Sequence, residues 1–275
     1  MRSDISSATM SRMESELISF SNHKKETLRG IFKRAPGSTG VIFAHGFGRT
    51  SMEPKFKNIA NKLEGKENLF FFDFSGCGLS EGSFEDITAD KLAKELSCAV
   101  SAFRDRVPRL KSIRLVSHSF ACAATIILCA REKDVFDKIV FLGPALNMSE
   151  ILKYSFVRRR NPGGKINWSN YKKHFDLRAY QREMKKDKQM TYSHFISNLH
   201  YLENKDRDYR ELMGIIPKEK LLIVQGDSDR SIPLESQGAY LKNFKTILVK
   251  GGDHDLERPD VVAKYLPQIV SFLSS

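Results

Sequence analysis

The chain has 275 residues, of which 41% are hydrophobic and 28% are charged, with a formal net charge of +12. This length and composition are typical of a globular protein that buries a sizeable core without disulfides or metals. The longest uncharged apolar stretch, Phe120 to Ala130, is too short to span a bilayer, which takes about 20 residues. The N-terminus lacks the apolar segment of a secretory signal, so we interpret residues 1–15 as a polar leader.

The first predicted elements form a β-hairpin, because residues Glu16–Asn22 and Glu26–Arg34 alternate apolar and polar side chains. Continuous apolar runs then predict strands that are buried on both faces. These runs are Thr39–Gly46, Asn68–Phe74, Ser112–Ser119, Lys138–Ala145, Lys220–Asp227 and Lys245–Gly252. The intervening segments predict helices at Pro54–Leu63, Ile87–Phe103, Phe120–Arg131, Pro233–Asn243 and Arg258–Leu273.

This alternation of strands and helices predicts an α/β fold with a mostly parallel central sheet and helices on both faces. In such sheets, ligands bind beyond the carboxyl ends of the strands. The polar residues that directly follow the strands are therefore the candidates for chemistry.

The stretch S-H-S-F-A, residues 117–121, lies between a predicted strand and a predicted helix. Ser119 fits the nucleophile of a G-x-S-x-G elbow, in which a serine occupies a sharp strand-to-helix turn. Ser117 and Ala121 stand where that pattern has glycine, and both are small enough for tight packing. The alternative is that the serine is an ordinary helix N-cap.

The stretch H-G-F-G, residues 45–48, ends the third predicted strand. Glycines such as Gly46 and Gly48 let backbone N–H groups turn toward a substrate oxygen, as an oxyanion hole requires. A simple glycine turn before a helix is the alternative. His-Gly-x-Gly directly after an apolar strand is less common than a simple glycine turn, which favours the oxyanion loop.

Two further strand ends carry Asp227 and Asp229, in Q-G-D-S-D, and His254, in G-G-D-H-D. The chain order Ser119, Asp, His254 is the order of an α/β-hydrolase catalytic triad. Four such features in the right order indicate that Ser119 is a nucleophile. The residues themselves leave Asp227 and Asp229 as alternatives for the acid.

From residue 16 to the C-terminus, apart from a middle insertion, the sequence resembles the serine hydrolases of the α/β-hydrolase superfamily. H-G-F-G resembles the oxyanion loop of esterases and acylglycerol lipases, and D-F-S-G-C-G-L-S-E-G (residues 73–82) resembles a further family segment. The resemblance implies a triad of Ser119, His254 and Asp229, the last because the family pattern G-x-x-D fits Gly226 and Asp229. It also implies that the N–H groups of Phe47 and Phe120 form the oxyanion hole beside His45, with no metal or organic cofactor.

The middle insertion, residues 147–217, resembles the cap of this superfamily and divides the predicted hydrolase core into residues 16–146 and 218–275. From Ile151 to Lys220 the chain has 17 Lys and Arg against 8 Asp and Glu. This basic segment either forms solvated helical faces or attracts an anionic membrane or an acidic substrate. No recognition motif predicts nucleic acid as a partner. Aromatic side chains could enter a lipid interface or line an acyl pocket: Tyr154, Phe156, Trp168, Tyr171, Phe175 and Phe195.

The expected function is therefore hydrolysis of a carboxylic ester, on a small-molecule or lipid substrate, through an acyl-enzyme. An acyl thioesterase uses the same residues and is the alternative within the enzymes. A non-catalytic binding protein of the same fold is the alternative outside them. The four cysteines (Cys77, Cys98, Cys122 and Cys129) show no metal-binding spacing and predict reduced thiols, hence a cytoplasmic location, with the cap able to attach at a membrane surface.

Overall fold

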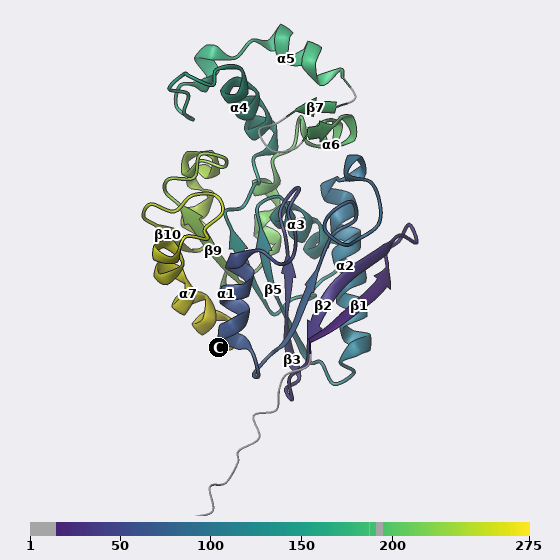
Figure 1. Ribbon diagram of the computed structural model, residues 1–275. Coiled ribbons are helices and arrows are strands. Elements are labelled where there is room, and N and C mark those ends of the chain that lie inside the picture. Colours follow the sequence, from purple (N-terminus) through teal and green to yellow (C-terminus); the bar gives the residue numbers. More distant parts are fainter. Residues whose placement is uncertain (1–14, 187, 191–194) are drawn as a thin grey trace, which may run out of the picture.

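The structure, a computed structural model, describes residues 15–186, 188–190 and 195–275. An eight-stranded sheet lies at its centre, in the order β1-β2-β4-β3-β5-β6-β9-β10 (Figure 1). β2 pairs antiparallel with β1 and β4, and the other neighbours pair parallel, which confirms the mostly parallel sheet. The strands are β1 Ser15–Ser21, β2 Thr27–Lys33, β3 Thr39–Ala44, β4 Asn68–Phe72, β5 Ser112–His118, β6 Lys138–Leu142, β9 Leu221–Gly226 and β10 Lys245–Val249.

Helices cover both faces of the sheet, because its strands are apolar on both sides. In β4, for example, Phe70 and Phe72 join one hydrophobic cluster while Leu69 and Phe71 join the other. The first cluster packs under α2 and α3, and the second packs under α1 and α7. These helices are α1 Pro54–Leu63, α2 Ala89–Arg106, α3 Ala121–Arg131 and α7 Pro259–Ser274.

The cap, residues 147–217, leaves the sheet directly after β6 and returns just before β9. Figure 1 shows α4, α5, β7 and α6 above the sheet, with α5 farthest from it. The elements of the cap are α4 Met148–Arg160, η2 Tyr171–His174, α5 Leu177–Met184, β7 Lys188–Met190, β8 Phe195–Ser197, α6 Asn198–Asn204 and the 3₁₀ segment η3 Tyr209–Ile215. The last of these, η3, packs against α3 in the hydrolase core. The remaining 3₁₀ segments are η1 Phe84–Asp86, η4 Lys218–Lys220 and η5 Leu234–Asn243.

Most of the aromatic side chains of the cap pack against one another. Tyr154, Phe156 and Tyr171 are buried in a third hydrophobic cluster, and Trp168 and Phe175 pack against it. The ring of Phe195 lies 5.1 Å from that of Phe84, measured between centroids. The aromatic residues thus give the cap a small core of its own.

One helix prediction differs from the structure. The segment predicted as a helix at Pro233–Asn243 forms two 3₁₀ turns separated by a kink at Gly238, where φ is 59° and ψ is −145°. The predicted leader, residues 1–15, lies outside the described residues except for Ser15, which begins β1. Within the described part of the chain, no helix is both long and apolar enough to cross a bilayer.

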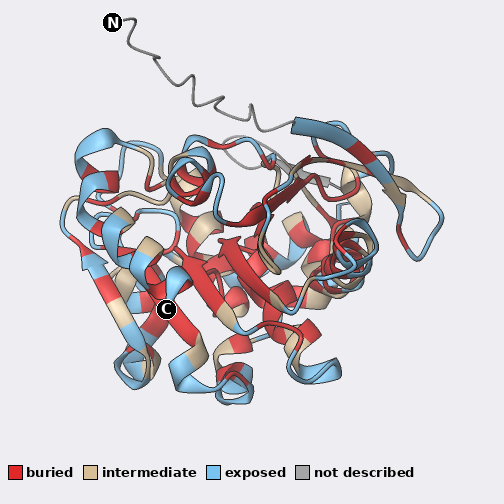
Figure 2. Ribbon diagram, turned by 90° about the horizontal axis from the view of Figure 1, so that it is seen from below, coloured by how far each residue is buried: buried red, intermediate tan, exposed pale blue. Residues whose placement is uncertain are grey.

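Burial follows these layers. Figure 2 shows the strands at the centre almost wholly buried, while the outward faces of the surrounding helices are exposed. The carboxyl ends of β3, β5, β9 and β10 therefore project from a rigid, closely packed platform. The predicted site residues follow these strand ends.

Candidate active site

Ser119 occupies a sharp turn between β5, which ends at His118, and α3, which begins at Ala121. Its φ is +55°, in the left-handed region that is uncommon for residues with a side chain. The N–H of Ser119 donates to the carbonyl of Leu142 (2.9 Å), and its carbonyl accepts from the N–H of Ala145 (3.1 Å). These bonds to the end of β6 hold a strained backbone in place, as is frequent at functional sites.

Ser117 and Ala121 fit the crowded positions beside the turn because both are small and fully buried. Thr125, one helical turn into α3, donates its hydroxyl to the carbonyl of Ala121 (2.9 Å) and lies 3.2 Å from the hydroxyl of Ser117. The polar group that replaces a glycine therefore has a partner inside the protein, as a buried hydroxyl requires. Sequence analysis did not single out Thr125.

The side chains of Ser119, His254 and Asp229 form a continuous hydrogen-bonded chain. His254 Nε2 lies 2.9 Å from Ser119 Oγ, and His254 Nδ1 lies 2.8 Å from Asp229 Oδ2. If Nδ1 carries the proton that bonds the carboxylate, Nε2 is left to accept the proton of the serine hydroxyl.

The carboxylate of Asp229 is buried and fixed from below. Its Oδ1 accepts hydrogen bonds from the N–H groups of Ser231 and Ile232, both at 2.8 Å. Asp227, the alternative, instead accepts from the Gly251 N–H (2.7 Å) and the Ser228 hydroxyl (2.9 Å), and is exposed. Asp227 thus braces the loop after β10, and Asp229 is the carboxylate that bonds His254.

Glycines let the loops after β9 and β10 approach each other. A Cβ at Gly226 would lie 2.2 Å from the carbonyl oxygen of Gly252. Any larger residue at Gly226 would separate the two loops and so move His254 away from Asp229. The close approach of the two loops explains why glycines lie at the end of β9 (Gly226) and shortly after β10 (Gly252).

The oxyanion-loop candidates, residues 45–48, lie against the serine turn. A Cβ at Gly46 would be 3.0 Å from Ser119 Cβ. The ring centroids of Phe47 and Phe120 are 6.0 Å apart. Within the described residues, the N–H of Phe120 donates no hydrogen bond, so this group is available to a ligand. Gly48 has a φ of +65°, which turns the backbone toward α1.

His45 is buried beneath this loop. Its Nε2 accepts the N–H of Phe74 (2.9 Å), which assigns the ring proton to Nδ1, 2.9 Å from the carbonyl of Gly46. Burial lowers the pKa of His45, so the ring is neutral. His45 therefore shapes the loop and takes no part in proton transfer.

The D-F-S-G-C-G-L-S segment, residues 73–80, forms hydrogen bonds that hold the candidate oxyanion loop in place. The sequence did not reveal this role. Asp73 accepts hydrogen bonds from the N–H groups of Ser51 (2.7 Å) and Leu79 (2.9 Å). Phe74, the next residue, bonds His45. The segment therefore ties the end of β4 to both ends of the loop after β3.

His118, directly before the serine, is a further site residue that sequence analysis missed. Its Nε2 donates to the carbonyl oxygen of His254 (3.0 Å), and the two ring centroids are 5.0 Å apart. Complete burial, with nearby Lys55, holds the pKa of His118 well below its usual value, so the ring is neutral.

Two ion pairs clamp the loop that carries His254. Arg49 pairs with Asp255. The fully buried ammonium of Lys55 lies 2.9 Å from both Glu53 and Glu257. These pairs tie the residues that follow β3 to those on the carboxyl side of His254 and restrict its movement. Both basic residues went unnoticed in the sequence because ion-pair partners about 200 positions apart leave no local pattern.

His200 of α6 connects the cap to the site. Its ring lies 4.6 Å from that of Phe47 and 4.7 Å from that of Phe120, and its Nδ1 lies 3.3 Å from the carbonyl of Ile87. Burial lowers its pKa to about 4, so the imidazole is neutral. The cap thus packs a neutral ring directly on the two predicted oxyanion-hole residues.

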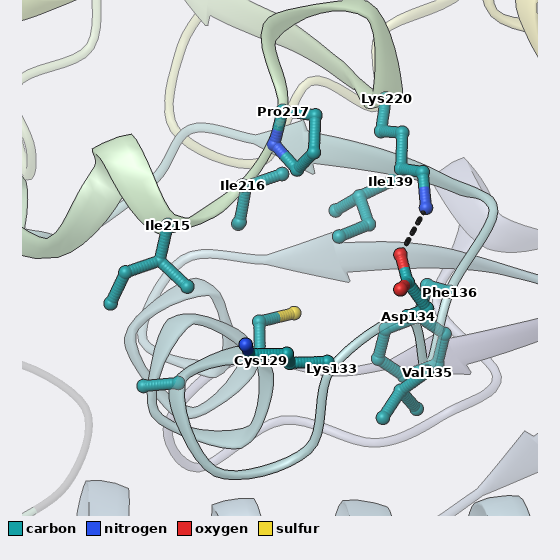
Figure 3. Close-up of a pocket in the computed structure, with 11 residues that line it drawn as sticks. Cys129, Lys133, Asp134, Val135, Phe136, Ile139, Ile215, Ile216, Pro217 and Lys220 are labelled. Atoms are coloured by element: carbon teal, nitrogen blue, oxygen red, sulfur yellow. Dashed lines mark hydrogen bonds and ion pairs between the residues drawn. The ribbon is translucent and has the colours of Figure 1, made fainter.

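A pocket of about 370 Å³ opens to the surface away from these residues, where α3 ends and β6 and β9 begin (Figure 3). Cys129, in the last turn of α3, lines it together with Ile216, Pro217 and the ion pair between Lys220 and Asp134 (2.8 Å). Ten residues of chain, about 15 Å of helix, separate Cys129 from Ser119. Burial raises the pKa of the Cys129 thiol to about 12, so it is no nucleophile.

The other three cysteines are also free thiols. Burial raises the pKa of Cys77 to about 12 and also raises the pKa of Cys98 and of Cys122. Among the described residues, no cluster of His, Cys, Asp and Glu could hold a metal ion.

Solved structures with a similar fold include an esterase and other hydrolases. Est1E from Butyrivibrio proteoclasticus with bound ferulic acid has a TM-score of 0.70 at 19% identity, over 94% of this chain and 98% of that one. The Pyrococcus furiosus esterase Pf2001 has a TM-score of 0.66 at 15% identity, over 95% and 91%. The mouse alpha/beta hydrolase domain-containing protein 10 has a TM-score of 0.65 at 12% identity, over 94% and 98%.

At these identities the likeness establishes the fold alone, and no curated protein sequence matches the chain significantly. The sequence profile of the alpha/beta hydrolase family, however, matches residues 41–265, which is most of the chain. The match extends from β3 to α7 and includes every predicted site residue. The chain is therefore a member of the alpha/beta hydrolase family.

Proposed function

We propose that the protein is a serine hydrolase that cleaves a carboxylic ester. The observation that carries the proposal is the unbroken hydrogen-bonded chain from Ser119 Oγ through His254 to the buried Asp229 carboxylate. A Ser–His–Asp chain with this polarity activates a hydroxyl for attack on an acyl carbon. The esterase among the similar structures supports an ester as the substrate.

In the first half of the reaction, His254 Nε2 takes the proton of Ser119 as Oγ attacks the ester carbonyl. Asp229 stabilises the imidazolium that forms, because its carboxylate is negatively charged and accepts a hydrogen bond from the Nδ1–H group. The N–H groups of Phe47 and Phe120 stabilise the oxyanion of the tetrahedral intermediate. Such donors each contribute about 10²–10³-fold in rate. The imidazolium then protonates the departing alcohol and leaves an acyl-Ser119.

In the second half, water enters and His254 removes its proton, so that hydroxide attacks the acyl-enzyme and releases the carboxylic acid. Ser119 regains its proton from His254, which completes the cycle without a redox change. The loop clamps at Asp255 and Glu257 keep the imidazole aligned through both halves.

The direct test is covalent labelling with a fluorophosphonate probe, read by intact mass. The wild type and Ser101→Ala, which changes an exposed serine on α2 away from the site, are expected to gain a single adduct, and Ser119→Ala none. p-Nitrophenyl esters of increasing chain length and matched acyl-CoA thioesters then establish the substrate. A thioester preference would replace the esterase by a thioesterase, and a folded wild type without adduct would indicate a binding protein.

A further inference from the structure

The net charge of the molecule is concentrated on the cap. Residues 148–186 contain eleven Lys and Arg but only three Asp and Glu, a net of +8 within a chain whose total is +12. All the other residues of the chain together carry the remaining +4 (12 − 8). A field this uneven attracts polyanions to one end of the molecule.

Helix α5 organises part of this charge into a stripe. Arg178, Gln181, Arg182 and Lys185 are exposed and follow the spacing i, i+3, i+4 and i+7 along and just beyond the helix, so they share one face. Ala179, Tyr180 and Met184 are buried in the cap cluster on the other side. Figure 1 shows α5 as the outermost element of the cap, so the stripe faces away from the sheet.

The basic residues of the stripe are available to a partner. Within the described residues, no carboxylate lies at ion-pair distance from Arg178, Arg182 or Lys185. The two lysines that shortly precede the helix, Lys172 and Lys173, are exposed as well, although Lys172 also pairs with Glu150 (2.9 Å). The nearby carboxylates have other partners, since Glu183 pairs with Arg159 and Arg160 and Asp176 caps α5 by accepting from the N–H of Ala179 (2.9 Å).

Leu177, the first residue of α5, is 55% exposed beside this stripe. α5 is a short surface helix with cations on its outer face and an exposed leucine at its edge. This arrangement is typical of helices that bind at the surface of a bilayer, where charged head groups adjoin apolar acyl chains. A nucleic acid would match the charge but not the leucine. The observations therefore favour the surface of a lipid bilayer.

We propose that the outer face of α5, formed by Leu177, Arg178, Arg182 and Lys185, docks the protein on a bilayer that contains anionic phospholipids. Binding is electrostatic, since each Lys or Arg near such a surface contributes about fivefold in affinity. Docking turns the cap toward the bilayer, and the cap begins at the carboxyl end of β6, beside the serine turn. If the proposed function holds, the substrate is an acyl ester held in or released from that bilayer.

The test is co-sedimentation with vesicles, using the Ser119→Ala protein so that binding is read without turnover. We expect binding to phosphatidylcholine vesicles that contain phosphatidylserine and none to phosphatidylcholine alone. The variant Arg178→Gln/Arg182→Gln/Lys185→Gln should bind about 100-fold more weakly, at about fivefold per charge. Because exposed charges are screened by salt, binding should also fall as ionic strength rises.

The matched control is Lys57→Gln/Lys62→Gln/Arg104→Gln, which removes the same charge from exposed positions on α1 and α2. Equal weakening by both triple variants would overturn the proposal, because binding would then follow net charge alone. Tighter binding to duplex DNA at equal phosphate concentration than to the anionic vesicles would also overturn it. The α5 triple variant with Ser119 intact should still gain a fluorophosphonate adduct. Weak vesicle binding by that variant can then be distinguished from loss of the active serine.

Discussion

The hydrolase core and the cap use aromatic and charged residues in different ways. In the core, large clusters on both faces of the sheet bury side chains such as Phe43 and Phe72. The buried charges there have ion-pair or hydrogen-bond partners, as at Lys55 and Asp73. In the cap, one small cluster of mainly aromatic residues supports a shell that carries most of the net positive charge. The core thus holds the candidate catalytic residues in fixed positions, whereas the cap exposes a positively charged surface.

The two regions meet at His200, whose ring packs on Phe47 and Phe120. Through this contact the cap lies against the candidate active site, and the position of the cap depends on the two predicted oxyanion-hole residues. The following predictions test the division between the regions, beginning with the largest effect.

Asp229→Asn is expected to lower kcat by about 10⁴-fold, because a neutral amide does not stabilise the imidazolium and its NH₂ group can donate to Nδ1, which places the ring proton on Nε2, where the serine proton must be accepted. Asp227→Asn changes the exposed neighbour in the same way and should alter kcat only a few-fold. Steady-state ester hydrolysis by both variants provides the measurement. Similar losses in the two would contradict the assignment of Asp229.

Phe71→Ala and Phe156→Ala remove fully buried rings from the core and from the cap cluster, respectively. Loss of a core phenylalanine costs about 3–5 kcal/mol in the free energy of unfolding. Phe71→Ala should therefore lower the main urea unfolding midpoint strongly. Phe156→Ala should instead increase proteolysis within the cap and leave that midpoint nearly unchanged. A large shift with Phe156→Ala would mean that the two regions unfold as one unit.

Lys55→Met removes the cation between Glu53 and Glu257. Breaking a buried ion pair leaves carboxylates unpaired and costs about 3–5 kcal/mol. We expect a lower Tm together with a lower kcat, because the loop after His254 loses its clamp. Lys57→Met, two residues along α1 and exposed, is the control and should leave both values unchanged.

His200→Gln tests the contact between the regions through pH. Burial lowers the pKa of His200 to about 4, so below pH 6.5 the unfolded chain binds a proton that the folded chain does not. Stability therefore falls on acidification, by about 2 kcal/mol between pH 6.5 and pH 5 for this residue. Urea unfolding at both pH values should show that the variant loses less stability than the wild type. An unchanged pH dependence would contradict the burial of His200.

Much of the fold could be predicted from the sequence because its signals are local. Continuous apolar runs identified the strands, and glycines and polar residues marked the strand ends where His45, Ser119 and His254 lie. The helix predicted at Pro233–Asn243 failed because the apolar pattern does not reveal the positive φ at Gly238. The cap aromatics were ambiguous for a related reason, since composition does not tell which rings face one another.

The sequence by itself determined the fold class, the order of the candidate triad and the basic character of the cap, all of which depend on residue type and spacing along the chain. Only the tertiary structure decided that Asp229 rather than Asp227 bonds His254, that Thr125 accommodates Ser117, and that Lys55 and His118 support the histidine loop. The physical reason is distance. Hydrogen bonds and ion pairs act over about 3–4 Å in space, and the residues they join here are separated by up to about 200 positions in the sequence.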